Sequence, residues 1–358
     1  MKRGKRGDTV HAVAPSDASP PKKLIRVLSI DGGGIRGLIP GKILESLEAK
    51  LKSAAGPQAT IADHFDLIAG TSTGGILACG LLAPDPEKPG RPRYSAEELV
   101  KMYVDHGDDI FHIPKLHTLA SLSGLLEEKY PASGIERVLE KYFGDTELAE
   151  LVGPALVTAY EIELRRTWFF VRPEDASKSE KVKLREVTRA TSAAPTFFEP
   201  ARVHSDGVQY AFVDGGVFAN NPALCAFAEA RKFEANPKAS DLAILSLGTG
   251  EHKIPYEYED AKRWGPIGWV HPILEIMMSG VAETVHYQLA RIFESVERPA
   301  QYLRIQPELP KDATEMDNTS PENIQHLIKR GAEAARQHDA QLDAFVELLV
   351  AGTVPAAG

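Results

Sequence analysis

Along most of this chain, short apolar segments alternate with longer stretches in which apolar and polar residues recur at helical spacing. Three apolar runs have the length of buried strands and end in glycine-rich turns: 24–30 ("LIRVLSI"), 64–70 ("HFDLIAG") and 241–250 ("DLAILSLGTG"). The stretches after the first two, 38–52 and 74–82, have the character of helices. Alternation of this kind is typical of α/β proteins, so we predict a layered α/β domain.

Capping patterns and turn residues mark further elements. Ser95 with Glu98 and Ser133 with Glu136 match the capping box, in which a serine is followed three residues later by a glutamate. Proline and charge at 84–93 predict a loop. Further strands are expected at 154–163, 166–171 and 210–214.

The pattern also divides the chain. Residues 1–23 carry six Lys or Arg against two Asp and no apolar run, which predicts a disordered basic tail. Residues 24–250 form the main domain, with an insertion at about 84–150 that is suited to form a cap or lid. After Gly250 the amphipathic stretches 270–293 and 322–350 predict a helical C-terminal extension, 251–358, packed on the sheet.

Composition excludes some classes of function. The 358 residues carry a formal net charge of −9, which argues against a nucleic-acid polymer as partner. No signal-like apolar segment follows the N-terminal charges, so a cytoplasmic protein is expected. The two cysteines give neither a disulfide framework nor metal-ligand spacing, and no metal or cofactor is expected.

Two glycine-rich turns carry the candidate chemistry. In "SIDGGGIRG" (29–37), Gly32, Gly34 and Gly37 match the GxGxxG pattern, which holds a pyrophosphate in dinucleotide folds and whose geometry would equally hold an oxyanion. In "GTSTG" (70–74), Ser72 lies between a predicted strand and a predicted helix, as in the GxSxG nucleophile turn. The alternative for Ser72 is a helix-capping serine.

A serine nucleophile needs a base. Five histidines in the C-terminal part are candidates by chain order, but none ends a strand beside glycines: His252, His271, His286, His326 and His338. Asp214 in "VDGG" does end a predicted strand before two glycines, although the same pattern is common in simple turns.

Four motifs together resemble the patatin-like phospholipases, which are lipid acyl hydrolases with a Ser-Asp dyad: "DGGGIRG" (31–37), "GTSTGG" (70–75), "TSAAPTFF" (191–198) and "DGGVFANNP" (214–222). The resemblance covers about 24–250. It implies a three-layer α/β/α fold around a mostly parallel sheet, with Ser72 as nucleophile and Asp214 as general base.

By the same resemblance, the glycine loop supplies the oxyanion hole. Backbone N–H groups of Gly33, Gly34 and Thr73 would stabilise the tetrahedral intermediate. Arg36 would either fix this loop, meet a lipid phosphate or form a structural salt bridge. The dinucleotide reading is disfavoured because no acid-terminated strand lies about twenty residues after Gly32. If the strands before the two turns are parallel neighbours, the turns lie side by side.

We therefore predict a phospholipase A or lysophospholipase that acts peripherally at the membrane on phospholipid. The length and the C-terminal extension further resemble bacterial anti-phage phospholipases that cyclic dinucleotides activate. This suggests a cyclic dinucleotide as activator, met by Arg263, Trp264, Trp269 and Arg304, for which ordinary packing is the alternative. An oligomer is compatible with the sequence. Two other classes stay open: a scaffold protein that has lost hydrolysis, and a dinucleotide-dependent oxidoreductase.

Overall fold

The computed structural model describes residues 24–111, 129–233, 237–310 and 315–352. The predicted basic tail at 1–23 and residues 112–128 of the predicted insertion therefore lie outside the described residues.

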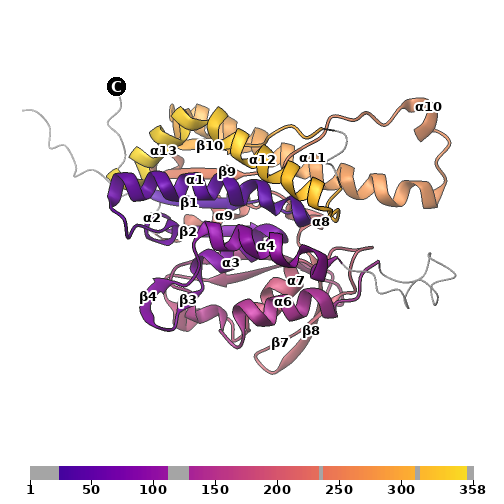
Figure 1. Cartoon of the computed structure of the whole chain (residues 1–358), viewed down its shortest axis with the longest axis horizontal. Helices are drawn as coiled ribbons and strands as arrows, with labels where there is room; N and C mark the ends of the chain where they lie inside the picture. Colours follow the sequence, from indigo (N-terminus) through magenta and orange to yellow (C-terminus); the bar gives the residue numbers. More distant parts are fainter. Residues whose placement is uncertain (1–23, 112–128, 234–236, 311–314, 353–358) are drawn as a thin grey trace, which may run out of the picture.

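A mixed, mostly parallel sheet of eight strands forms the centre of the molecule (Figure 1). Strands β10, β9, β1, β2 and β5 are parallel neighbours in this order, whereas β6, β8 and β7 are antiparallel to the strands they pair with. The strands, in chain order, are β1 (Ile25–Ile30), β2 (Leu67–Thr71), β5 (Ala155–Glu161), β6 (Arg166–Arg172), β7 (Ala201–Ser205), β8 (Val208–Asp214), β9 (Leu242–Leu247) and β10 (Tyr302–Ile305). The predicted mostly parallel sheet is confirmed.

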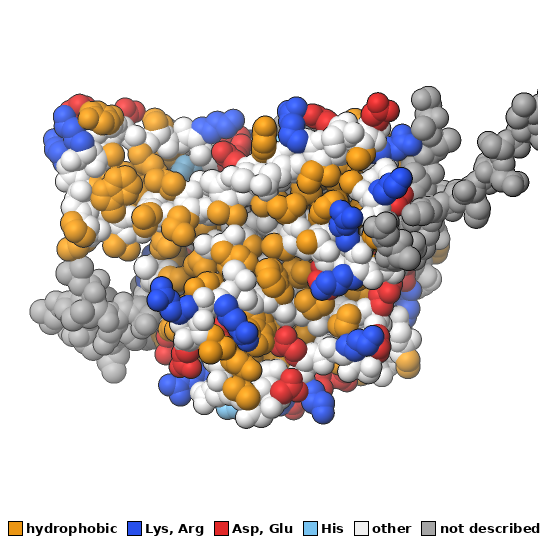
Figure 2. Space-filling view, turned by 180° about the vertical axis from the view of Figure 1, so that it is seen from behind, with side chains coloured by type: hydrophobic (Ala, Val, Ile, Leu, Met, Phe, Trp, Pro, Cys, Tyr) orange, Lys and Arg blue, Asp and Glu red, His pale blue; other side chains and the backbone are white. Residues whose placement is uncertain are grey.

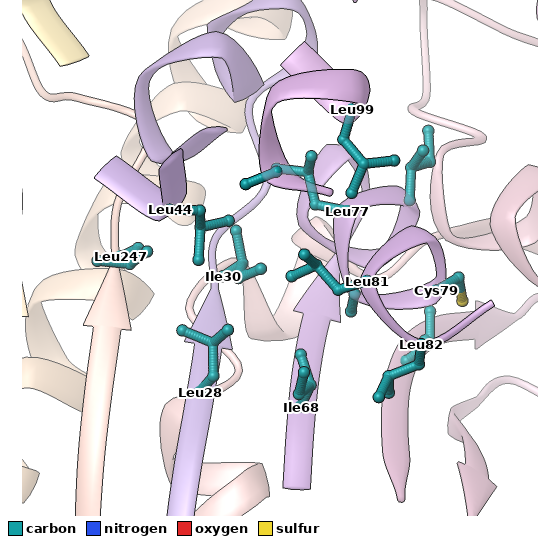
Figure 3. Packing of buried hydrophobic residues seen from close by; sticks show 14 of the residues in the cluster. Leu28, Ile30, Leu44, Ile68, Leu77, Cys79, Leu81, Leu82, Leu99 and Leu247 are labelled. Carbon is teal, nitrogen blue, oxygen red and sulfur yellow. The ribbon is translucent and has the colours of Figure 1, made fainter. Parts of the chain in front are cut away.

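Both faces of the sheet are buried. Successive side chains of a strand point to opposite faces, so Leu28 and Ile30 of β1 enter one hydrophobic core while Ile25 and Val27 enter another. Figure 3 shows the first core, where Leu44, Leu77 and other helix residues pack on Leu28 and Ile30. The continuous apolar runs noticed in the sequence are therefore strands covered on two sides, which is the three-layer arrangement.

Helices form the two outer layers. Those that contribute to the first core are α1 (Leu38–Ala55), α3 (Thr73–Leu82), α4 (Ala96–Ile110), α6 (Ser133–Phe143), α7 (Leu184–Thr191), α12 (Pro321–Gln337) and α13 (Asp339–Ala351). The second core is covered by α9 (Ala223–Ala230) and α11 (Pro266–Ser295). Short helices complete the fold: α2 (Ile61–His64), α8 (Gly216–Ala219) and α10 (Tyr258–Ala261). None of the described helices combines the length and the apolar character needed to cross a bilayer.

Local signals in the sequence had different outcomes. The capping box is confirmed at α4, where the Ser95 hydroxyl accepts a hydrogen bond from the Glu98 amide. At α6 the N-cap is Ala132, so Ser133 is already helical. The loop predicted at 84–93 is instead a small hairpin of β3 (Pro84–Asp85) and β4 (Lys88–Pro92). Its strands are largely exposed and carry prolines, so no apolar alternation marked them.

The region after Gly250 is not only helical. Its strand β10 pairs in parallel with β9 at the edge of the main sheet. This strand has only four residues, one of them an arginine, so the sequence gave no strand signal there. The described residues on both sides of Gly250 therefore share one sheet, and the predicted division there stays a prediction.

Candidate active site

Strand β5 brings the two candidate catalytic residues together. The last residue of β2, Thr71, pairs with Thr158, and the last residue of β8, Asp214, pairs with the next residue of β5, Ala159. Strand β2 runs parallel to β5 and β8 runs antiparallel to it, so the two strands approach each other and end at the same place. Ser72, which follows Thr71, therefore meets Asp214.

Ser72 occupies the sharp turn between β2 and α3. Its backbone adopts φ 54° and ψ −124°, a left-handed conformation that is strained for a residue with a side chain. A Cβ atom on Gly70 would collide with the Gly74 carbonyl, and one on Gly74 would collide with the Ile30 carbonyl. The turn therefore requires both glycines of "GTSTG". The Thr191 hydroxyl accepts a hydrogen bond of 2.8 Å from the Ser72 amide and holds the turn in place.

Asp214 is buried and faces the serine. The hydroxyl of Ser72 donates a hydrogen bond to its carboxylate, and the Gly216 amide donates a second one of 2.7 Å to Oδ1. Burial raises the pKa of Asp214 from 3.8 to about 7, although both hydrogen bonds oppose the rise. The carboxyl is 5% exposed. A carboxylate in this setting is far more basic than one in water.

The first glycine turn lies against the serine. Strands β1 and β2 are parallel neighbours, which confirms that the turns after them are adjacent. A Cβ atom on Gly32 would lie 3.2 Å from the Ser72 Cβ, and one on Gly37 would collide with the Thr73 hydroxyl. Gly34 has φ 58° and approaches the Met316 carbonyl, to which the next amide, that of Ile35, donates. Only glycine fits such close contacts.

Three backbone amides beside Ser72 have no hydrogen-bond acceptor among the described residues: those of Gly33, Gly34 and Thr73. Gly33 precedes the short 3₁₀ helix at Gly34–Gly37, Gly34 is its first residue, and Thr73 is the first residue of α3. The first N–H groups of a helix have no partner within it, so these three amides stay free of helical hydrogen bonds. All three residues line the same pocket as Ser72.

The pocket beside these residues is almost wholly apolar. The empty space in and before it measures about 880 Å³, a figure that includes open solvent. Ser72 and Asp214 line it together with side chains from α3, α4, α6, α11 and the segment 192–198, among them Ile76, Tyr103, Ile135, Phe197, Leu274 and Met278. No histidine lies among the described residues that line it.

Comparison with known proteins decides the family. The family model described as "Patatin-like phospholipase" matches residues 28–227, more than half of the chain. This chain belongs to the patatin-like phospholipase family.

Full-length relatives agree with this membership. The phospholipase is 35% identical to "Patatin-like protein 2" of Oryza sativa subsp. japonica, over 88% of this chain and 85% of the relative. It is 32% identical to "Patatin group J-1" of Solanum tuberosum, over 89% and 86%. A solved structure, "Human GIVD cytosolic phospholipase A2", aligns with a TM-score of 0.47 and 10% identity, over 92% of this chain and 60% of that one. The family makes the chain a lipid ester hydrolase.

Arg304 contacts the glycine loop, which the sequence does not predict. Arg304 of β10 donates two hydrogen bonds, of 2.8 and 2.6 Å, to the carboxylate of Asp31, the residue that opens the glycine loop. Both side chains are buried, and burial raises the pKa of Asp31 against the influence of the arginine. The sequence suggests Arg304 as one of the contacts for a cyclic dinucleotide. The structure instead places it beneath the loop, a position that no local sequence signal could reveal.

Arg36 belongs to the glycine loop, within its short 3₁₀ helix Gly34–Gly37. It is half-buried, and burial lowers its pKa to about 10 while the nearby Glu275 of α11 opposes that shift. The salt-bridge alternative is therefore the one that its surroundings favour.

The histidine alternative finds no support in the geometry. His286 Nδ1 lies 3.1 Å from the Tyr302 hydroxyl, and His338 Nδ1 lies 2.9 Å from the Ala334 carbonyl oxygen. Neither group lines the pocket of the phospholipase.

Proposed function

We propose that this patatin-like phospholipase cleaves carboxylic esters of membrane lipids with Ser72 as nucleophile and Asp214 as general base. One observation carries the proposal: the Ser72 hydroxyl donates a hydrogen bond to the buried Asp214 carboxylate, and both residues line the apolar pocket. A nucleophile in hydrogen-bond contact with a base is the arrangement that acyl transfer requires.

The aspartate acts without a histidine. Its pKa of about 7 places it where a general base works best near neutral pH. As Ser72 Oγ forms a bond to the ester carbonyl carbon, Asp214 accepts the hydroxyl proton. When the tetrahedral intermediate collapses, the C–O bond to the leaving alcohol breaks and Asp214 returns the proton to that alcohol. Water, activated by the same carboxylate, then releases the fatty acid.

The negative charge that develops on the carbonyl oxygen needs hydrogen-bond donors. The amides of Gly33, Gly34 and Thr73 are suited to this role because they face the pocket beside Ser72 and lack acceptors among the described residues. Thr73 also begins α3, so the positive end of that helix dipole favours the anion. We assign the oxyanion hole to these three amides.

The pocket indicates the substrate class. Its apolar lining suits an acyl chain and offers little to a charged or polar head group. The head group would therefore stay outside while one chain enters. Membrane phospholipid is the substrate that we propose.

Activation by a cyclic dinucleotide stays a prediction that rests on the sequence. Of its four residues, Arg304 is bound to Asp31 and Arg263 pairs with Asp260, while Trp264 and Trp269 pack edge to face at 5.0 Å. Addition of cyclic dinucleotides to the ester assay tests it. A rise in rate is expected. If the dinucleotides neither bound to the protein nor raised the rate, the hypothesis would be removed.

Hydrolysis of a soluble short-chain chromogenic ester tests the proposed mechanism. Ser72→Ala and Asp214→Asn should each lower kcat by about a thousandfold or more, because members of one catalytic unit fail together. Ser192→Ala is the matched control, since this serine lines the same pocket but donates its hydroxyl to the Thr188 carbonyl. Wild-type rates in both test variants would refute the dyad. An inactive wild type would favour the scaffold alternative.

A further inference from the structure

The first half of α11 presents an apolar face that is partly open to solvent. Trp269, Val270, Ile273, Ile276 and Met277 occupy positions i, i+1, i+4, i+7 and i+8, which lie on one side of a helix. Each is 40–47% exposed, although such a face normally packs in a core. We call these five residues the α11 face.

The α11 face lies at a projecting end of the molecule. Figure 1 shows α10 and the start of α11 extending from the body, and Figure 2 shows hydrophobic side chains gathered at that end. Ile267 and Tyr258 add to it, with 72% and 76% exposure. Exposed apolar surface that is concentrated in one place marks an interaction site rather than scattered chance exposure.

The α11 face is continuous with the pocket. Met277 belongs to both, and its neighbours Leu274 and Met278 line the pocket from the adjacent side of the same helix. A lipid that left a bilayer covering this face would thus reach the pocket without crossing water. A second protein copy seated there would cover the pocket entrance instead.

The positive charges beside the α11 face are paired with acids. Lys262 pairs with Glu259 and Arg263 pairs with Asp260 on α10, so this end offers no excess of positive charge to anionic lipid. Trp269 adds an amphipathic ring, which prefers the boundary between head groups and acyl chains. These features fit a zwitterionic lipid surface that is met by apolar insertion.

We propose that the α11 face inserts into the surface of a phospholipid bilayer and places the pocket entrance against the lipid. The inference rests on the proposed lipid hydrolysis for its purpose, but binding is measured separately. It assigns the membrane contact to five named residues.

Co-sedimentation with phosphatidylcholine vesicles tests the surface. All binding variants carry Ser72→Ala, so that no lipid is consumed. Ile273→Asp with Ile276→Asp should weaken vesicle binding by about tenfold or more, since two side chains lose their burial and two charges must enter the interface. The matched control is Val208→Asp, because Val208 is 49% exposed on the β7–β8 hairpin, away from α11 (Figure 1). It should bind like the parent.

Activity of the same substitutions with Ser72 intact separates this inference from the proposed function. Vesicle hydrolysis should fall about tenfold while soluble-ester hydrolysis stays within about twofold. Unchanged vesicle binding in the double variant, or binding to anionic vesicles alone, would overturn the inference. An equal loss of activity on the soluble ester would also overturn it. The same holds if the parent protein is a dimer that binds no vesicles and the double substitution dissociates that dimer. If the wild type hydrolysed no ester, the proposed function would fail, and the binding result would still decide the role of the α11 face.

Discussion

At the scale of single residues, the proposed mechanism depends on how strongly the surroundings of Asp214 alter its carboxyl group. Asp214 ends a strand and is enclosed by the sheet and the glycine turns, so water cannot stabilise its charge. The serine hydroxyl and the Gly216 amide supply the hydrogen bonds that keep the anion accessible. In the proposed dyad, this carboxylate is basic enough to take the role that histidine has in the usual triad.

The raised pKa predicts the pH dependence of activity. Below pH 7 Asp214 is protonated and cannot accept the serine proton, so kcat/KM should rise with pH and level off above about pH 7. A pH profile on a soluble ester measures this. A profile already flat from pH 5 upward would show that the base titrates at an ordinary carboxyl value.

The same pKa has a consequence for stability. The folded chain binds the Asp214 proton more tightly than the unfolded chain does, so protonation of Asp214 stabilises the fold. This contribution is complete below pH 4 and is lost as pH rises through about 7. Asp214→Asn keeps a neutral group in place and should therefore raise the free energy of unfolding at pH 8, by up to about 4 kcal/mol. Urea unfolding at pH 5 and pH 8 checks it, and an equal effect at both values would contradict the account.

At the scale of elements, β5 sets the geometry of the site. Its residues Thr158 and Ala159 pair with the ends of two strands that come from distant parts of the chain, and a register shift of one residue would separate Ser72 from Asp214. The turn after β2 then needs a strained serine and two glycines. The sheet register and the turn therefore together position Ser72 and Asp214, the proposed dyad.

A methyl group on the turn should disrupt this packing. In Gly74→Ala the new Cβ would collide with the Ile30 carbonyl, which is backbone and cannot rotate away. We expect a loss of about 3 kcal/mol or more in the free energy of unfolding, and loss of activity. Gly280→Ala in α11 is the control, since nothing lies within 4 Å of its Cβ position, and helix propensity should stabilise it by up to about 1 kcal/mol. Equal unfolding midpoints for the two variants would refute the steric argument.

At the scale of the whole molecule, the C-terminal region completes the site. Strand β10 forms the sheet edge and carries Arg304 to Asp31, and the Met316 carbonyl holds the amide after Gly34. Both contacts act on the glycine loop. The matched family segment, 28–227, includes neither Arg304 nor Met316, so this chain's loop depends on parts beyond that segment.

Removal of one member of the buried ion pair should be costly. Arg304→Met leaves the Asp31 carboxyl buried without its partner and should cost about 3–5 kcal/mol. Adding Asp31→Asn should recover part of this, because no charge then remains uncompensated. Arg202→Met, at an exposed arginine of β7, should stay within about 0.5 kcal/mol. Strictly additive losses in the double variant, measured in urea, would argue against the pair.

Much of this arrangement could be predicted from the sequence because its turns are local. Gly70, Ser72 and Gly74 identify their turn within five residues, and Asp214 is marked by the two glycines after it. The β5 register, the position of Arg304 and the exposure of the α11 face could not be predicted, since each depends on pairing between distant segments. A short strand such as β10 leaves almost no periodic signal.

The most direct test of the central claim is covalent labelling with a fluorophosphonate, which reacts with serines that a neighbouring base has activated. Peptide mass spectrometry of the labelled full-length chain should locate the adduct on Ser72, and Asp214→Asn should abolish or greatly slow the labelling. Label on a different serine, or the same labelling rate in Asp214→Asn, would contradict the proposal that Ser72 and Asp214 form the catalytic dyad.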